Sequence, residues 1–301
     1  MGLIDRSISL ALPVVPRPIV RYFSKRYIAG SSVADALGVV RQLKQAGAMA
    51  TLDILGEFVN AEAEARAASD AYVAALHAIR EQGVDTNVSL KLTQLGLKLD
   101  QDLCHAMTRR VVETAVSLDN FVRLDMEDST CTEDTLHLFQ RLHADFPRHV
   151  GCVIQAYLRR SEGDVRGLVA MGANVRLCKG IYIEPPTLAF RDPGEINRNF
   201  VTLLTLLLEG GAYTGIATHD DALVGAGYEL VKRLNLTPDR YEFQMLLGVR
   251  GPLRRSVAAD GHRLRVYVPF GPHWHAYSLR RLKENPRIAG YVLRAFLNGR
   301  S

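Results

Sequence analysis

From about residue 30 the chain alternates short apolar, β-branched runs with longer segments whose apolar residues recur at helical spacing. Alternation of this kind is typical of βα units built around a parallel sheet. The short runs predict eight strands, which in chain order are Met49–Ile54, Asn87–Leu92, Phe121–Met126, Gly151–Tyr157, Asn174–Cys178, Gly215–Thr218, Tyr241–Leu246 and Arg265–Val268.

The segments between these runs carry helix signals of their own. Ser32 opens a helix before the first strand, and Asp192, followed by proline and then by glutamate at the third helical position, is a typical N-cap. We also expect helices to begin at Thr132 and Ser161, and an Ala-rich helix to end at Gly83.

Eight strands, each followed by a helix, over about 250 residues match a (βα)8 TIM-type barrel of the α/β class. The alternative is an open doubly wound sheet, which would want a Gly-rich turn after its first strand to hold a nucleotide. The residues after Ile54 read Leu55-Gly56-Glu57-Phe58 and provide no such turn. We therefore expect one barrel domain over residues 1–301, with an N-terminal extension at 1–30, an extra N-terminal helix and an active-site helix after strand eight.

The composition is that of a soluble globular protein, with 48% apolar and 23% charged residues among 301. No run approaches the roughly 18 apolar residues of a membrane-spanning helix, and the apolar stretch at 8–15 is broken by Pro13. Four cysteines show no CxxC spacing, which favours a reducing compartment, and no partner residues complete a metal site around His273 and His275. We expect a cytoplasmic protein without a metal.

Positive charge is concentrated at the two ends of the chain. The net charge is +5, but residues 252–301 hold ten Lys and Arg against two acidic residues, and residues 1–30 hold five against one. Basic segments favour an anionic partner, which the charge alone leaves open between a small ligand, a membrane surface and nucleic acid. No interleaved aromatic residues or RNA-binding module accompany the charge, so we expect no nucleic-acid partner.

The segment 277–284 is the strongest candidate for chemistry. As a helix it would place Tyr277, Arg280, Arg281 and Glu284 on one face, where an amphipathic helix normally carries apolar residues. Adjacent arginines repel each other unless anions lie opposite them, and Glu284 supplies only part of that compensation. Either the missing anion is a substrate carboxylate or a phosphate, or the face is a solvated basic surface.

Polar side chains also follow the other predicted strands, at the ends that form the active face of a barrel. They are Lys91, Asp125, Glu127, Gln155, Arg176, Lys179, Tyr182, His219, Asp220, Gln244 and Tyr267. Lys91 and Asp125 interrupt apolar strands, where a charge is costly unless it meets an opposite charge. Either the two pair with each other, or Lys91 joins the paired arginines around one carboxylate while Asp125 and Glu284 hold these cations in position.

Two of these strand ends suit a ligand that has a flat ring and phosphates. At the fifth, Gly180 follows Arg176 and Lys179, where a residue without a side chain lets a ring approach the backbone. At the sixth, Thr218 and His219 precede a helix, a suitable place for ribose or phosphate groups. No Ser/His/Asp or Cys/His signature supports nucleophilic hydrolysis.

Taken together, these segments resemble proline dehydrogenase, the FAD-dependent (βα)8 flavoenzyme of proline catabolism, in its monofunctional bacterial form. The similarity runs from about Tyr27 to Glu284, with segments in strand order: Thr51–Glu57, Val88–Leu92, Leu124–Glu127, Ile154–Tyr157, Val175–Tyr182, Ala217–His219, Tyr241–Leu246 and Tyr277–Glu284.

The resemblance implies oxidation of L-proline to Δ1-pyrroline-5-carboxylate, the first step of proline degradation, by hydride transfer from substrate C5 to flavin N5. It implies a catalytic set of Lys91, Asp125, Arg176, Tyr267, Arg280, Arg281 and Glu284. Substrate contacts would come from Lys91, Leu177, Tyr182, Tyr267, Tyr277, Arg280 and Arg281, with Asp125 and Glu284 orienting the cations. FAD contacts would come from Gln155, Arg176, Lys179, Gly180, Thr218, His219 and Gln244.

The resemblance also implies partners beyond the substrate. The family generally passes its electrons to a membrane quinone, so we expect a quinone-type acceptor, a peripheral contact with the inner membrane face, and a separate pyrroline-5-carboxylate dehydrogenase downstream. Ile181 departs from the family pattern, which commonly has Ala there, and it would narrow the pocket beside the flavin.

Two other interpretations stay open at this point. One is a Schiff-base lyase on the same barrel, with Lys91 or Lys179 as the amine nucleophile. The other is a non-enzymatic protein that binds anions or nucleic acid through its basic C-terminal segment.

Overall fold

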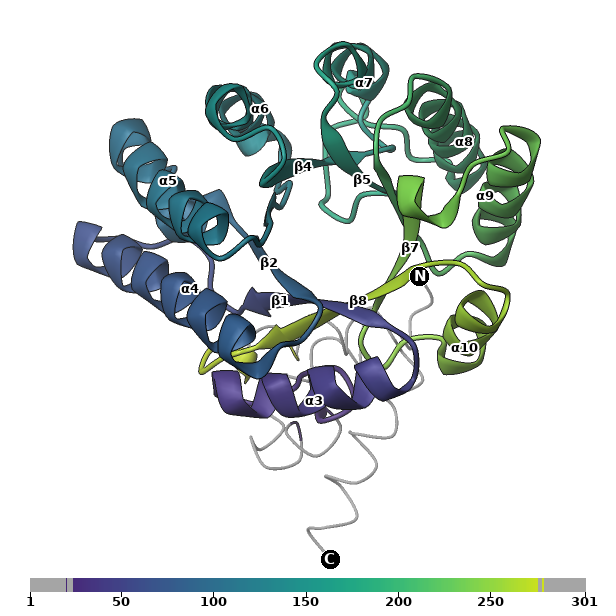
Figure 1. Cartoon of the computed structure of the whole chain (residues 1–301). Helices are drawn as coiled ribbons and strands as arrows, with labels where there is room; N and C mark the ends of the chain where they lie inside the picture. The colour runs from purple at the N-terminus through teal and green to yellow at the C-terminus, as the bar shows by residue number, and fades with distance from the viewer. Residues whose placement is uncertain (1–19, 21–23, 276–277, 279–301) are drawn as a thin grey trace, which may run out of the picture.

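The centre of the molecule is a closed barrel of eight parallel strands, each hydrogen-bonded to its neighbours in chain order (Figure 1). The computed structural model describes residues 20, 24–275 and 278. Its strands are β1 (Met49–Ile54), β2 (Thr86–Leu90), β3 (Val122–Leu124), β4 (Val150–Gln155), β5 (Asn174–Cys178), β6 (Thr214–Ala217), β7 (Tyr241–Leu246) and β8 (Leu264–Phe270). The ring closes where Met49 on β1 pairs with Arg265 on β8 and Ile54 pairs with Phe270. The fold predicted from the sequence is confirmed.

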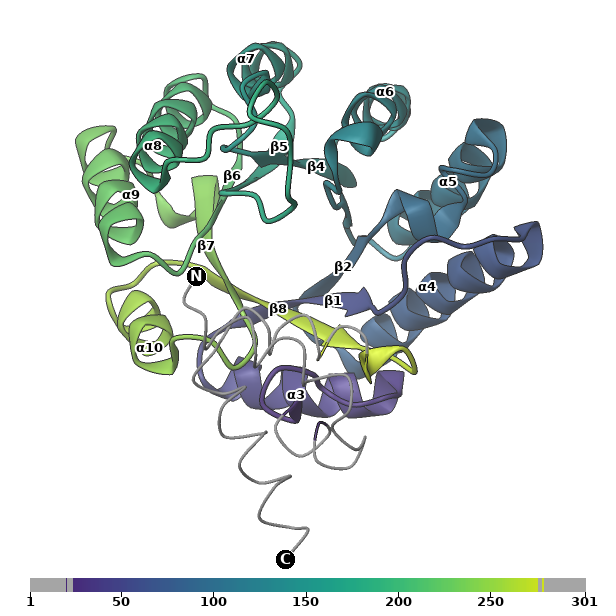
Figure 2. The same ribbon diagram turned by 180° about the vertical axis from the view of Figure 1, so that it is seen from behind.

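Helices form an outer ring around the strands (Figures 1 and 2). They are α3 (Val33–Gln45), α4 (Glu62–Gln82), α5 (Gln101–Ser117), α6 (Ser129–Asp145), α7 (Ser161–Ala170), α8 (Pro193–Glu209), α9 (Asp221–Arg233) and α10 (Gly251–Ala259), with 3₁₀ turns η2 (Leu92–Leu95) and η3 (Pro238–Arg240). The extra N-terminal helix, α3, contacts β1 and β8 and fills the place in the ring between α10 and α4.

Local signals set most of the helix boundaries. Ser32 caps α3 by accepting the Asp35 N–H at 3.1 Å, and Asp192 caps α8, as predicted. The expected start of α6 at Thr132 is wrong, because Asp128 accepts the N–H of Thr130 and the helix begins at Ser129. An aspartate cap therefore decided this boundary.

The buried side chains fall into two groups, one apolar and one polar. Between the strands and the helices lies an apolar core, in which side chains such as Tyr72, Phe139 and Phe200 are fully buried. The buried polar set includes Asp53, Ser89, Lys91, Arg123, Asp125, Arg176, Glu242, Gln244 and Arg265, all on or directly after barrel strands. A buried charge is costly unless it is paired and hydrogen-bonded, so these side chains need partners inside the barrel.

Some expectations fall on residues that the structure does not describe. Tyr277, Arg280, Arg281, Glu284 and the helix expected to carry them lie outside the described residues, as does most of the N-terminal extension. Among the helices that are described, none combines the length and apolarity needed to cross a membrane.

Candidate active site

A cavity of about 640 Å³ opens at the carboxyl ends of the strands. Most of the residues predicted at the strand ends line it: Lys91, Asp125, Gln155, Arg176, Lys179, Gly180, Tyr182, Thr218, His219, Asp220, Gln244 and Tyr267. Apolar walls come from Met126, Val153, Ile181, Met245 and Leu246. The volume lies within the range of roughly 300–1,000 Å³ that holds small ligands and cofactors.

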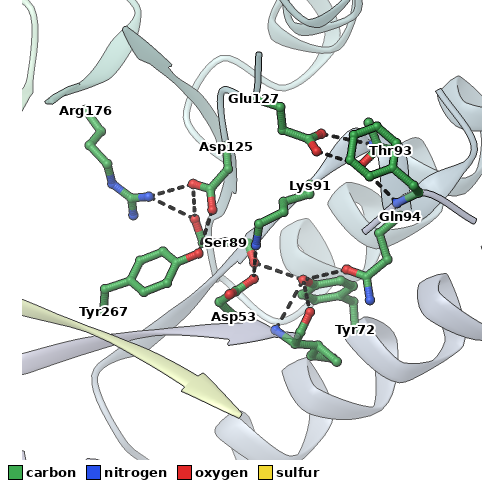
Figure 3. A network of polar contacts seen from close by, with 12 residues as sticks. Asp53, Tyr72, Ser89, Lys91, Thr93, Gln94, Asp125, Glu127, Arg176 and Tyr267 are labelled. Carbon is green, nitrogen blue, oxygen red and sulfur yellow. Dashed lines mark hydrogen bonds and ion pairs between the residues drawn. The ribbon is translucent and has the colours of Figure 1, made fainter. Parts of the chain in front are cut away.

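Lys91 is held at one side of this cavity by a carboxylate that the sequence analysis did not assign to the site. Its Nζ donates to Oδ1 of Asp53 at 2.9 Å, and Asp53 is fully buried on β1 (Figure 3). Burial opposes the charge on Lys91, but the carboxylates of Asp53 and Asp125 outweigh it and raise the pKa of the ammonium. Lys91 is therefore a fixed cation near neutral pH.

Asp125 organises a second cluster. Its Oδ1 accepts from Ser89 Oγ and from Arg176 Nη1, each at 2.6 Å, and its Oδ2 accepts from Tyr267 Oη at 2.8 Å (Figure 3). The Arg176 guanidinium also lies 5.3 Å from the centre of the Tyr267 ring. Burial and then the Asp125 charge raise the pKa of Tyr267, which keeps the phenol a neutral donor. One carboxylate thus fixes a cation and a ring that both face the cavity.

These pairings resolve the alternative left open for Lys91 and Asp125. The two do not form a salt bridge with each other, because Lys91 pairs with Asp53 and Asp125 pairs with Arg176. The expectation that Asp125 holds Lys91 in position is therefore corrected: Asp125 positions Arg176, and Asp53 positions Lys91.

On the other side of the cavity, the turn after β6 presents donors and acceptors around the N-terminus of α9. Lys179 donates to Asp220 Oδ2 at 2.6 Å, and Asp220 also caps α9 through the N–H of Ala222 at 3.0 Å. His219 Nε2 accepts the N–H of Leu246 at 2.9 Å, so the proton of the neutral ring is on Nδ1. A helix cap therefore fixes Lys179, and a strand fixes the tautomer of His219.

Gln155 and Glu127 hold the chain around η2 and β4. Gln155 Nε2 donates to the Glu127 carbonyl at 2.7 Å. The Glu127 carboxylate accepts from the N–H and hydroxyl of Thr93 at 3.1 and 2.6 Å (Figure 3). Burial raises the pKa of Glu127. Glu127 serves the backbone of η2, whereas Gln155 lines the cavity.

Leu177 is placed differently from expectation, and Gly180 lies in the cavity wall with a ring packed against it. Leu177 is fully buried in the apolar core, because neighbouring side chains of a strand point to opposite faces and Arg176 points inward. Gly180 lines the cavity, but a Cβ there would lie 2.1 Å from Tyr157 Cδ1, so the missing side chain makes room for the Tyr157 ring.

A closed (βα)8 barrel with paired charges around one cavity at the carboxyl ends of its strands defines a barrel enzyme with a small-molecule site. The family model described as Proline dehydrogenase matches residues 36–294. The chain belongs to the proline dehydrogenase family, whose members are oxidoreductases that oxidise proline in proline catabolism.

Similar proteins agree with this assignment. The chain is 36% identical to the proline dehydrogenase of Deinococcus radiodurans over 300 residues, which covers 96% of this chain and 97% of that protein. It is 37% identical to proline dehydrogenase 1 of Bacillus subtilis over 277 residues, 92% of this chain and 91% of the other. Among solved structures, proline utilization A from Bdellovibrio bacteriovorus inactivated by N-propargylglycine superposes with a TM-score of 0.82 at 27% identity. That match covers 88% of this chain and 33% of the longer protein.

Proposed function

We propose that the chain oxidises L-proline to Δ1-pyrroline-5-carboxylate with FAD as its cofactor and passes the electrons to a quinone-type acceptor. The observation that carries this proposal is the clustering of Lys91, Arg176 and Tyr267 around a single cavity in a barrel of this family. The test is whether the purified chain carries FAD that L-proline reduces in the absence of oxygen.

The lining of the cavity fits a flavin nucleotide. Apolar walls and a few fixed polar groups are what an aromatic cofactor needs. The side chains that would hold it are those of Gln155, Arg176, Lys179, Thr218, His219 and Gln244, with the backbone of Gly180. FAD, when bound, would accept the hydride of proline C5 at flavin N5. Arg176 would place a positive charge beside the ring, and Lys179 would place one near the turn after β6.

The part of the cavity that would bind the substrate lies beside the ion pairs Lys91–Asp53 and Arg176–Asp125. Lys91, kept protonated by Asp53, would bind the carboxylate of L-proline, together with Arg280 and Arg281. Tyr267, fixed by Asp125, and Tyr182 would wall the pyrrolidine ring. Holding the carboxylate and the ring together would aim one carbon of the substrate at the cofactor and exclude water from it.

The product and the electrons would leave for other partners. We propose that a separate pyrroline-5-carboxylate dehydrogenase consumes the product and that the basic N-terminal residues support a peripheral contact with a quinone-bearing membrane.

The charge state of the lysines argues against a Schiff-base lyase. A lysine that attacks a carbonyl must be neutral, which requires a lowered pKa. The pKa of Lys91 is raised, and Lys179 forms an ion pair with Asp220 at 2.6 Å. Borohydride should therefore trap no carbonyl substrate on either lysine.

Replacing Gly180 by Ala should weaken FAD binding by about tenfold or more, because holding a non-Gly residue in a sparsely populated backbone conformation costs roughly 1–3 kcal/mol, and relieving that strain would shift backbone that lines the cavity. Gly180 has a φ of 103°, and a Cβ would push the Tyr157 ring away from β5. The measurement is fluorescence titration of the apoprotein with FAD. Gly172→Ala is the matched control: its φ is also positive, at 67°, but a Cβ there meets no atom within 4 Å. Equal affinities in the two variants would contradict the prediction.

A further inference from the structure

A column of buried hydrogen bonds runs through the barrel below the cavity. Arg265 Nε donates to Glu242 Oε1 at 2.8 Å, and Gln244 Nε2 donates to the same oxygen at 2.5 Å. The Gln244 Oε1 atom then accepts from Arg176 Nε at 2.5 Å. Arg265 lines a cavity at the amino ends of the strands, whereas Gln244 and Arg176 line the active-site cavity. The column therefore connects the floor of the barrel to Arg176.

The order of donors and acceptors in this column fixes one amide. A glutamine side chain has an oxygen that accepts and a nitrogen that donates, and only the oxygen can serve Arg176. Because an ionised Glu242 only accepts, it takes the nitrogen of Gln244 and leaves the oxygen for Arg176.

Glu242 keeps its charge because of its partners. Burial by itself would raise the pKa of Glu242, but the Arg265 charge and hydrogen bonds from Arg265, Tyr213 and Gln244 outweigh it and lower the pKa to about 2. The carboxylate is thus ionised at any pH at which the enzyme would work, and the orientation of the Gln244 amide does not depend on pH.

Glycine at position 215 leaves space for the amide. A Cβ on Gly215 in β6 would lie 2.5 Å from Gln244 Nε2 and 2.8 Å from its Cδ. A glycine within a strand often marks such a close approach. The Gln244 amide therefore fits closely against the backbone of Gly215 and is oriented by the charge of Glu242.

We propose that Glu242 is a positioning residue for Arg176, acting through the amide of Gln244, with Arg265 and Gly215 as its supports. In this arrangement Arg176 is held at both ends of its guanidinium group, by Gln244 at Nε and by Asp125 at Nη1. The expected effect on the cofactor rests on the proposed function, in which Arg176 lies beside the flavin.

The first experiment measures the flavin in Glu242→Gln. A neutral glutamine at 242 can donate to Gln244, so the amide can turn its nitrogen toward Arg176 and displace the cation. We expect a more negative flavin midpoint potential and a loss of kcat of roughly ten- to a hundredfold, the size of one charge-assisted hydrogen bond, with KM for L-proline little changed. Gly215→Ala, which displaces the amide without changing any charge, should shift the potential in the same direction.

Tyr213→Phe is the matched control. Tyr213 donates to the other oxygen of Glu242, Oε2, at 2.9 Å. Its replacement removes one hydrogen bond from the same carboxylate and leaves the hydrogen bond from Gln244 in place. It should lower the melting temperature while leaving the potential and kcat as in wild type. If Glu242→Gln behaves like Tyr213→Phe, with lower stability and an unchanged flavin, Glu242 has a structural role only and the proposal is wrong.

A second measurement does not depend on the cofactor. A double-mutant cycle between Glu242→Gln and Arg176→Met, followed by urea unfolding of the apoprotein, should show clear non-additivity when Gln244 is present and none in a Gln244→Met background. Additive effects with Gln244 present would refute the positioning role even if the wild-type chain held no flavin. A wild type without flavin would refute the proposed function separately.

Discussion

Lys91→Met is expected to reduce kcat/KM for L-proline by about 30-fold to a few thousandfold, because loss of one partner from a buried charge pair costs roughly 2–5 kcal/mol. The structure gives the reason in two steps. Asp53 and Asp125 raise the pKa of Lys91 and keep it protonated, and the hydrogen bond to Asp53 fixes it at the wall of the cavity. A methionine keeps the length and apolar character of the stem but removes the charge that would bind the carboxylate of the substrate.

The matched control for Lys91 is Lys179→Met. Lys179 also lines the cavity and also forms one ion pair, with Asp220, but its side chain is more exposed, at 34% against 10% for Lys91. Under the proposed function, Lys179→Met should lower the affinity for FAD. In the enzyme saturated with FAD, it should leave the KM for L-proline nearly unchanged. If Lys91→Met and Lys179→Met changed the binding of L-proline and the binding of FAD equally, the assignment of Lys91 to the substrate and of Lys179 to FAD would be wrong.

Asp125→Asn is expected to destabilise the protein by about 3 kcal/mol and to reduce kcat at least about a hundredfold. Asparagine has nearly the same shape, so the change removes the negative charge and turns one of the two acceptor oxygens, which now take hydrogen bonds from Ser89, Arg176 and Tyr267, into an amide donor. The Arg176 side chain, only 8% exposed, would keep its charge without the carboxylate that now lies 2.6 Å from it. Urea unfolding measures the first effect, and steady-state kinetics with L-proline measure the second.

Ser89→Ala is the control that distinguishes the effect of the Asp125 charge from the effect of one hydrogen bond to Asp125. Ser89 donates to Asp125 Oδ1 at 2.6 Å and accepts from Arg176 at 3.0 Å, but it carries no charge. Its loss should cost only about 1 kcal/mol and should leave kcat within about tenfold of wild type. An Asp125→Asn variant no worse than Ser89→Ala would show that the ion pair with Arg176 does not organise this side of the cavity.

The sequence predicted the fold because local patterns and barrel geometry agree. Strands buried on both faces read as apolar β-branched runs, and β1, β5 and β7 begin and end at the predicted residues. Boundaries failed where a single side chain decides them, as at Asp128 before α6, or where a strand gives way to a 3₁₀ turn, as at Leu90 before η2.

Among the residues that the structure describes, the sequence also predicted most of those that surround the cavity, because polar side chains at strand ends of a barrel must converge. It did not predict their pairing. Lys91 and Asp125 each needed an opposite charge, but the partners, Asp53 and Arg176, lie on other strands and depend on the tilt of the barrel. Asp53 carried the same signal as Asp125, a carboxylate within an apolar strand, and that signal could have placed it in the site.

The most direct test of the account is an anaerobic titration of the purified chain with L-proline, followed by flavin absorbance. The chain should be yellow and should bleach with L-proline, whereas pyrrolidine, which has the same ring but no carboxylate, should leave the absorbance unchanged at the same concentration. Full bleaching by pyrrolidine would contradict carboxylate recognition by Lys91. A colourless chain, or a yellow one that L-proline does not bleach, would contradict the proposed flavin-dependent oxidation itself.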